Sequence, residues 1–207
     1  MHIKGIQVGQ LGTNCYIVAD EATKECAVID PGDESSVILD YLEDNHLTCK
    51  VIMLTHGHHD HWLGLDGVRE GTGAPAYINK KDAYPRGQAG PRMKFPADEE
   101  IRYYAEGDTV TVGSLVFTVM ETPGHSSGSV CLICGDAIFS GDTLFRDSCG
   151  RTDFEDGDMN AMLQSLLRLD ALEGNYEVYP GHMEYTSLDR ERAFNYYITY
   201  AKNSTGK

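Results

Sequence analysis

The chain has 207 residues, with 17 lysines and arginines against 32 aspartates and glutamates and a formal net charge of −15. Nucleic-acid backbones are bound by clustered cations, and the sequence has no basic run, so we expect no nucleic-acid partner. No stretch is apolar and long enough to form a signal peptide or to span a bilayer. These features predict a cytoplasmic protein without a membrane partner, built as one domain over residues 1–207.

The first part of the chain predicts an antiparallel meander that continues into alternating helices and strands. Strand-like runs, joined by turn-rich segments, cover residues 3–8, 15–19, 26–29 and 51–54. Asp33 or Ser35 is predicted to cap a helix between the third and fourth of these runs. The next elements are expected to be a helix from Trp62 or Leu63 to Gly71, a strand over 76–78 and a short helical piece over 79–84.

Residues 85–100 contain three prolines, two glycines and little periodicity, so we predict an irregular loop. A lid over a binding site and a disordered surface excursion are both open interpretations of this loop. Six more strands are predicted over 101–104, 110–112, 115–121, 129–134, 137–140 and 177–179. One helix should carry Met159, Met162, Leu163, Leu166 and Leu167 on a single face, and another should run from about 187 to 201.

The six cysteines are scattered along the chain, which is typical of free thiols in a reducing compartment. Cys131 and Cys134 form a C-x-x-C pattern inside a predicted strand. A separation of three places their side chains on opposite faces of a strand, so we interpret the pair as core packing.

Metal-capable side chains concentrate directly after the predicted strand over 51–54. They are His56, His58, His59, Asp60 and His61. A histidine-rich surface turn is the plain alternative, but a junction between a strand and a helix favours a site. Further candidate ligands follow later predicted strands, namely His125, Asp142 and His182.

The spacing His-x-His-x-Asp-His, with the later residues in order, resembles the signature of the metallo-β-lactamase fold superfamily. The resemblance implies an α/β (α+β) fold, a four-layer αββα sandwich with a dinuclear metal site at one edge of its paired sheets. It implies one metal ion held by His56, His58 and His125, and a second held by Asp60, His61 and His182. Asp142 would bridge the two ions, while His59 is expected to point away from them.

Asp30 has two interpretations. It can simply begin the turn at Pro31 and Gly32, or, as the resemblance implies, lie beneath the metal site and orient a ligand by hydrogen bonding. We favour the second. The mixed imidazole and carboxylate ligands suit two divalent ions, with Zn(II) expected first and Fe(II) or Mn(II) as alternatives.

Residues 141–145, 148–154 and 179–182 resemble the glyoxalase II (hydroxyacylglutathione hydrolase) branch, especially its short bacterial members. This resemblance implies hydrolysis of a small thioester by a metal-bridging hydroxide, with Asp60 as a metal ligand that could also carry a proton. Glyoxalase II has a lysine and a tyrosine where this chain has Arg151 and Asp153. Arg151 is our candidate for substrate binding, although the two side chains can instead pair with each other.

Two other functions stay open. The run Cys-Gly-Arg-Thr-Asp-Phe over 149–154 also resembles persulfide dioxygenases, which use a single Fe(II). A metal-binding protein without turnover is the second alternative, whereas an exported β-lactamase is disfavoured by the missing signal. We expect a small-molecule thioester as the partner and a monomer or homodimer as the assembly.

Overall fold

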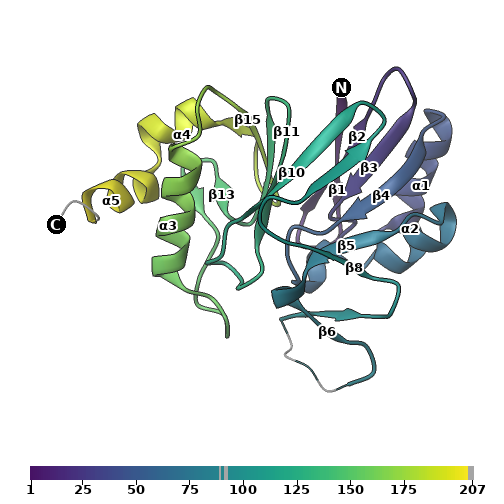
Figure 1. Cartoon of the computed structure of the whole chain (residues 1–207), viewed down its shortest axis with the longest axis horizontal. Helices are drawn as coiled ribbons and strands as arrows, with labels where there is room; N and C mark the ends of the chain where they lie inside the picture. The colour runs from purple at the N-terminus through teal and green to yellow at the C-terminus, as the bar shows by residue number, and fades with distance from the viewer. Residues whose placement is uncertain (89, 91–92, 205–207) are drawn as a thin grey trace.

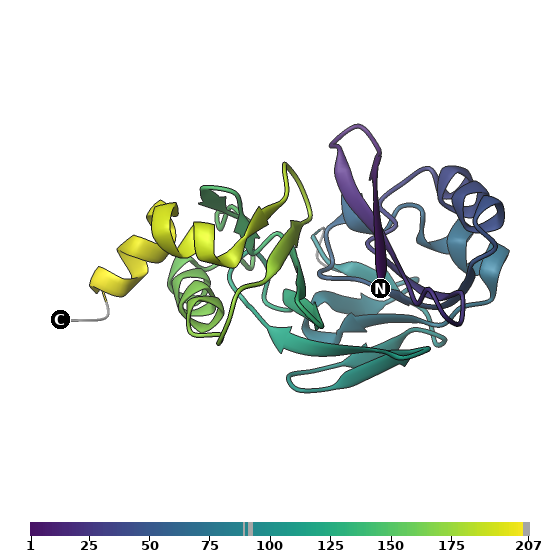
Figure 2. The same cartoon turned by 90° about the horizontal axis from the view of Figure 1, so that it is seen from above.

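The computed structural model describes residues 1–88, 90 and 93–204. Two mixed sheets lie face to face, with helices covering the outer face of each, so the predicted αββα sandwich is confirmed (Figure 1). Seen from above, the helical layers lie at opposite ends and the sheets between them (Figure 2). No helix of the described part of the chain has the length and apolarity needed to cross a bilayer.

The first sheet has six strands, and the helices on its outer face come from the same half of the chain. Its strand order is β1 (His2–Val8), β2 (Thr13–Ala19), β3 (Glu25–Ile29), β4 (Thr48–Met53), β5 (Ala76–Asn79) and β8 (Arg102–Tyr104). The covering helices are α1 (Ser35–Asp44) and α2 (Leu65–Thr72). β1 to β3 form the predicted antiparallel meander, whereas β3, β4, β5 and β8 run parallel.

The second sheet also has six strands. Its order is β16 (Thr186–Ser187), β15 (Glu177–Pro180), β12 (Ala137–Gly141), β11 (Val130–Cys134), β10 (Leu115–Glu121) and β9 (Thr109–Val112). The helices outside it are α3 (Met159–Asp170), α4 (Leu188–Phe194) and α5 (Tyr196–Ser204). Short pieces complete the chain, namely the 3-10 turns His59–His61 and Lys80–Asp82 and the two-stranded sheets β6 (Ala83–Pro85) with β7 (Phe95–Ala97) and β13 (Leu144–Phe145) with β14 (Ser148–Cys149).

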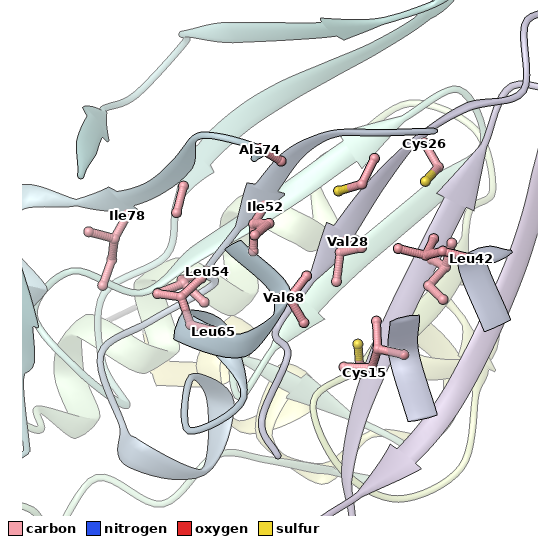
Figure 3. Close-up of a cluster of buried hydrophobic side chains, with 14 of the residues drawn as sticks. Cys15, Cys26, Val28, Leu42, Ile52, Leu54, Leu65, Val68, Ala74 and Ile78 are labelled. Carbon is pink, nitrogen blue, oxygen red and sulfur yellow. The ribbon is translucent and has the colours of Figure 1, made fainter. Parts of the chain in front are cut away.

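Three hydrophobic clusters hold these layers together. One lies between the first sheet and its helices, where Leu65 and Val68 of α2 face Ile52 of β4 (Figure 3). A second joins the two sheets, and a third lies under α3 to α5. Cys134 belongs to the cluster between the sheets and Cys131 to the outer one, which confirms that the two thiols lie on opposite faces. All six cysteines are free.

Strand direction brings several chain segments to one edge of the sandwich. β3 and β4 are parallel, so the residues after them emerge side by side. In the second sheet β12 and β15 are parallel, and β10 runs the same way because β11 is antiparallel to both β10 and β12. The segments after all five strands therefore converge at this edge.

The sequence-based boundaries were wrong around the helix starts. Neither Asp33 nor Ser35 caps α1, because its N-cap is Glu34 in a left-handed conformation (φ 47°) and Asp33 accepts a hydrogen bond from the Glu34 amide instead. The helix expected from Trp62 or Leu63 is α2, which begins only at Leu65, beyond the end of the 3-10 turn His59–His61. The piece expected to be helical over 79–84 becomes a 3-10 turn and then β6.

The segment 85–100 is more ordered than an irregular loop. Its first residue, Pro85, is the last residue of β6, and β7 lies within it. β6 and β7 pair in parallel. Phe95 is fully buried and packs edge-on against Trp62, with ring centroids 5.2 Å apart. Residues 89, 91 and 92 of this segment lie outside the described part. The interpretation of the segment as a lid stays open.

The C-terminal helix expected from about 187 to 201 is two helices that meet at Asn195, so that boundary was also wrong. Asn195 has an extended backbone (ψ 121°), which ends α4. Its buried side chain donates to the Ser148 carbonyl and to Glu191 Oε2, both at 2.9 Å, and accepts from the Tyr197 amide that starts α5. The hydrogen bonds of Asn195 therefore end one helix and begin the next. The spacing of apolar residues, from which one helix was predicted, does not reveal these bonds.

We predict that Asn195→Ala lowers the free energy of unfolding by about 2–4 kcal/mol, because buried partners of its amide lose their hydrogen bonds. Urea denaturation followed by circular dichroism measures this change. Asn203→Ala, at an exposed position on α5, is the matched control and should stay within about 0.5 kcal/mol. Equal effects of the two substitutions would contradict this role of Asn195.

Candidate metal centre

The segment after β4 supplies four of the candidate ligands in two different conformations. His58 is extended (φ −69°, ψ 143°), and the 3-10 turn His59–His61 follows it, closed by a hydrogen bond from the His61 amide to the His58 carbonyl at 3.1 Å. The turn reverses the direction of the chain. Asp60 and His61 are thereby presented from a different angle than His56 and His58, while His59 is exposed, as expected.

The seven predicted ligands come together in one cluster. Their candidate ligand atoms form three groups, each with all atoms within 4.8 Å of one another: His56, His58 and His125; His56, His61 and Asp142; and Asp60, His61 and His182. The shared members show that the groups are neighbouring parts of one centre. The candidate ligands that follow four different predicted strands are thus brought to the same place, whereas His59 stays outside.

Distances across the cluster suit ligands arranged around ions. Asp142 Oδ2 lies 3.3 Å from His125 Nε2 and 3.6 Å from His182 Nε2, and Asp142 Oδ1 lies 3.5 Å from His61 Nε2. Atoms that coordinate one tetrahedral ion at about 2.0–2.1 Å are roughly 3.3 Å apart. Asp142 thus lies between the two histidine groups, within reach of both.

Unsatisfied buried atoms give the independent test that this cluster fits a cation. The Nε2 atoms of four histidines and Asp142 Oδ1 are buried and have no hydrogen-bond partner within the described residues: His56, His58, His61 and His125. Burying polar atoms without partners is costly. Divalent ions at these atoms would remove that cost, so the cluster is suited to binding divalent metals.

Hydrogen bonds at the opposite ring nitrogens orient three of these histidines. His125 Nδ1 lies 2.7 Å from the Arg151 carbonyl, which can only accept, so Nδ1 carries the proton and the Nε2 lone pair faces the centre. His61 Nδ1 lies 2.9 Å from Asp30 Oδ2. Thr55 Oγ1 donates to that same carboxylate oxygen at 2.6 Å and lies 3.1 Å from His56 Nδ1.

Asp30 occupies the position beneath the centre that the resemblance implied. It follows β3 in a left-handed conformation (φ 50°), an uncommon backbone for a non-glycine residue, and it is 1% exposed. Its Oδ1 accepts from the Thr55 amide at 2.7 Å, and its Oδ2 contacts His61. Asp30 thus connects the end of β3 to the segment that carries the ligands.

Electrostatics divide the cluster into two parts. Burial lowers the pKa of His58 to about 4 and that of His56 well below its usual range, so both are neutral at pH 7. Burial also acts to lower the pKa of His61, but the carboxylates of Asp30 and Asp142 outweigh it and raise that pKa to about 9. The carboxylate-rich part therefore favours positive charge, supplied by protons or by a metal ion.

Asp82 is a functional candidate that the sequence analysis missed. It is fully buried and accepts from the Gly57 amide at 2.8 Å, the Gly128 amide at 2.6 Å and Ser126 Oγ at 2.6 Å. Burial raises its pKa. These bonds tie the segment of His56 and His58 to the segment of His125. No motif marked this aspartate, which lies in a Lys-Lys-Asp stretch predicted to be helical.

A glycine allows the last ligand segment to approach closely. A Cβ atom on Gly181 would lie 2.3 Å from Asp142 Oδ1 and 2.7 Å from His61 Cε1. Its amide donates to the Gly141 carbonyl at 2.8 Å. The Pro-Gly-His sequence therefore brings His182 beside Asp142, which a larger residue at position 181 would prevent.

Arg151, the candidate for substrate binding, lies at the rim of the centre. Its guanidinium forms two hydrogen bonds of 2.7 Å with the Asp153 carboxylate, so the alternative pairing is present. The same guanidinium lies over the ring of Phe154 at 4.4 Å, and that ring packs edge-on against His58 with centroids 5.1 Å apart. The Arg151 side chain is thus exposed and one aromatic ring away from a candidate ligand.

The fold and the centre together define a class of protein, the αββα proteins that carry a buried histidine and aspartate cluster suited to divalent metals. The chain belongs to the metallo-beta-lactamase superfamily, whose family model matches residues 8–182. The matched region runs from the end of β1 to His182 and contains all seven candidate ligands.

Two relatives share a name. The hydroxyacylglutathione hydrolase of Hydrogenovibrio crunogenus is 38% identical over 163 residues, which cover 79% of this chain and 55% of the relative. The hydroxyacylglutathione hydrolase GloC of Haemophilus influenzae is 29% identical over 209 residues, covering 96% of this chain and 98% of the relative. The chain thus spans about half of the first relative and nearly all of the second.

Three crystal structures are similar over nearly the whole chain. BLEG-1 B3 metallo-beta-lactamase gives a TM-score of 0.84 at 31% identity, covering 96% of this chain and 100% of its own. ETHE1 from Myxococcus xanthus gives 0.81 at 30% identity, covering 99% and 91%. TTHA1623 in a di-iron-bound form gives 0.79 at 33% identity, covering 94% and 100%. The same fold therefore serves proteins of several names, one of which holds two iron ions.

We predict that Asp30→Asn weakens metal binding by about 10- to 100-fold, because the amide no longer holds His61 as the carboxylate does. Titration of metal-depleted protein with Zn(II) in a calorimeter measures the affinity. Asp40→Asn, an exposed aspartate on α1, is the control and should bind as the wild type does. Unchanged affinity in Asp30→Asn would contradict the orienting role.

Asp82→Ala should lower the free energy of unfolding by about 2–4 kcal/mol, since two buried amides and a hydroxyl lose their acceptor. Chemical denaturation measures the loss, and Asp40→Ala serves as its control. Asp82→Asn retains one acceptor oxygen and should recover part of the stability. A loss in Asp82→Ala no larger than in Asp40→Ala would show that the two ligand segments are held by other contacts.

Proposed function

We propose that the protein is a metal-dependent hydrolase of a small thioester such as a hydroxyacylglutathione. The observation that carries this proposal is the cluster of five imidazoles and two carboxylates, in which only Asp60 and His182 are partly exposed. Four of the imidazole Nε2 atoms lack hydrogen-bond partners among the described residues. The two relatives named as hydroxyacylglutathione hydrolases support the choice of a thioester.

Our ligand assignment follows the two parts of the cluster. We assign one ion to His56, His58 and His125 and a second to Asp60, His61 and His182, with Asp142 shared between them. Zn(II) is the metal we propose first, and Fe(II) or Mn(II) are alternatives that accept the same ligand types. Two divalent ions bound there would supply a hydroxide nucleophile at neutral pH and polarise the thioester carbonyl.

The chain itself needs to provide little acid catalysis for this reaction. A departing thiolate has a pKa of about 8.5, so it leaves without a strong proton donor. Asp60 is the candidate proton carrier: its side chain is 16% exposed, and its Oδ2 accepts from Thr13 Oγ1 at 3.3 Å and lies 3.1 Å from His182 Nε2. Asp60 thus combines a ligand position with access to solvent.

Arg151 stays our candidate for holding an anionic group of the substrate. Its bond to Asp153 is a surface ion pair, with side chains 61% and 65% exposed, and such pairs contribute little stability. A substrate carboxylate can therefore compete with Asp153 for the two parallel hydrogen bonds of the Arg151 guanidinium. The proposal also keeps the expectations of a small-molecule partner, no nucleic acid or membrane partner, a cytoplasmic location and a monomer or homodimer.

The test begins with elemental analysis of protein purified without added metal. A panel of thioesters follows, including lactoylglutathione and coenzyme A esters. We expect two ions per chain, thioester cleavage that chelation abolishes, and recovery on addition of Zn(II). His58→Ala should lower the rate by about 100-fold or more by removing a ligand, while His2→Ala, at an exposed histidine outside the cluster, should leave it unchanged.

A persulfide dioxygenase is the second candidate, favoured by the run over 149–154 and by the similarity to ETHE1. It predicts one iron per chain and oxygen uptake with glutathione persulfide. Oxygen uptake without thioester cleavage would overturn the hydrolase proposal. A chromogenic β-lactam belongs in the same panel because of the similarity to BLEG-1, and metal binding without any turnover would favour a binding protein.

A further inference from the structure

A cleft of about 400 Å³ opens beside the metal centre, on the side of Asp60. We call it the leucine cleft and define it by six of its lining residues: Val8, Leu11, Thr13, Asp33, Asp60 and Leu63. Asp60 belongs to both the cleft and the centre, and Thr13 donates to it. A molecule in this cleft would therefore lie against Asp60, one of the candidate metal ligands.

Two exposed leucines give the cleft an apolar patch. Leu11, in the turn between β1 and β2, is 61% exposed, and Leu63, just after the 3-10 turn of the ligands, is 53% exposed. Buried Val8 lines the same space. A single exposed leucine is ordinary. Two that line one cleft next to a buried polar centre provide a surface for an apolar group of the substrate.

Carboxylates outnumber cationic side chains around the cleft. The titratable side chains that line it within the described residues are Asp33, Asp60 and His59, and its lining has neither lysine nor arginine. Glu34 adds a third carboxylate nearby, since its Oε2 accepts from the Gly9 amide at 3.1 Å. A carboxylate placed in this cleft would be repelled.

A cation lies on another side of the centre. The Arg151 guanidinium stacks on Phe154, which packs against His58, whereas the cleft adjoins Asp60. The two sides of the centre thus differ in both polarity and charge.

The walls of the cleft are fixed to the ligand segment. A Cβ atom on Gly32 would lie 2.0 Å from the Asp60 carbonyl oxygen, so only glycine permits this contact between the two segments. The Gly64 amide donates to the Pro31 carbonyl at 2.9 Å. The cleft is therefore a preformed feature at a set position relative to Asp60.

We propose that the leucine cleft binds the acyl group of the thioester and selects short, uncharged, apolar chains. The thiol moiety of the substrate, with its carboxylate, would extend toward Arg151. This inference rests on the proposed hydrolysis. In that reaction, water adds to the carbonyl carbon and the carbon–sulfur bond breaks with its electron pair on sulfur. The products are a carboxylate and a thiol, and one proton is released to solvent. The cleft would set which acyl chains enter.

The test uses thioesters of one thiol, glutathione, with acetyl, butyryl, hexanoyl and succinyl groups. For the wild type we expect kcat/KM to rise about threefold to fourfold per added methylene that becomes buried. Succinyl matches butyryl in chain length but ends in a carboxylate, and we expect it to react at least about tenfold more slowly because of the carboxylates near the cleft. These comparisons measure size and charge separately.

Substitutions in the cleft then test which residues cause the preference for particular acyl chains. Leu11→Ala and Leu63→Ala should each raise KM for the hexanoyl substrate by about fivefold to tenfold. The kcat for this substrate, and both kcat and KM for the acetyl substrate, should change less than about twofold. Asp33→Asn should reduce the ratio of kcat/KM between the butyryl and succinyl substrates. The substitution removes the negative charge of Asp33 and keeps an acceptor for the Glu34 amide. Val116→Ala, an exposed residue on β10 outside the cleft, is the control and should match the wild type.

The outcomes separate the two proposals. Absence of any thioester cleavage by the metal-loaded wild type would overturn the hydrolase proposal and this inference with it. Cleavage without chain-length dependence, or with equal losses on acetyl and hexanoyl substrates in the leucine variants, would overturn the acyl cleft alone. Inhibition by free hexanoate provides a second measurement, which should weaken in Leu63→Ala and stay unchanged in Val116→Ala.

Discussion

The hydrogen bonds of one buried carboxylate, that of Asp30, are the interaction on which the arrangement of the candidate metal centre depends. Asp30 follows β3, yet it holds the Thr55 amide and hydroxyl and the ring of His61, all from the segment after β4. Through the Thr55 hydroxyl it also reaches His56. One side chain thus orients histidines from both parts of the cluster, and its left-handed backbone is the conformation that aims it there.

Asp82, like Asp30, is a buried carboxylate that holds together two segments carrying candidate ligands, and it involves the second sheet. It joins the segment of His56 and His58 to the segment after β10, where His125 lies. The centre therefore lies across the gap between two sheets whose ligand segments are linked by buried carboxylates. Such bonds are strong because few waters compete with them, and they leave the imidazole nitrogens free to face a cation.

Much of this arrangement could be predicted because it depends on local pattern. The ligands follow predicted strands, and the spacing of His56, His58, Asp60 and His61 resembles a family motif, which implied both the cluster and the layered fold. The errors fall where a long-range contact overrides local preference. Burial of Phe95 orders a segment that looked irregular, Asn195 divides a helix that looked continuous, and Asp82 acts through residues over 40 positions away.

The Arg151 carbonyl holds His125, while the Arg151 side chain points to the rim. The first contact belongs to the backbone, so it persists whatever amino acid stands at that position, provided that the loop keeps its path. Residue 151 can therefore change identity, and with it the charge at the rim, without loosening the imidazole beneath. The side chain at the rim and the orientation of His125 are thus independent of each other.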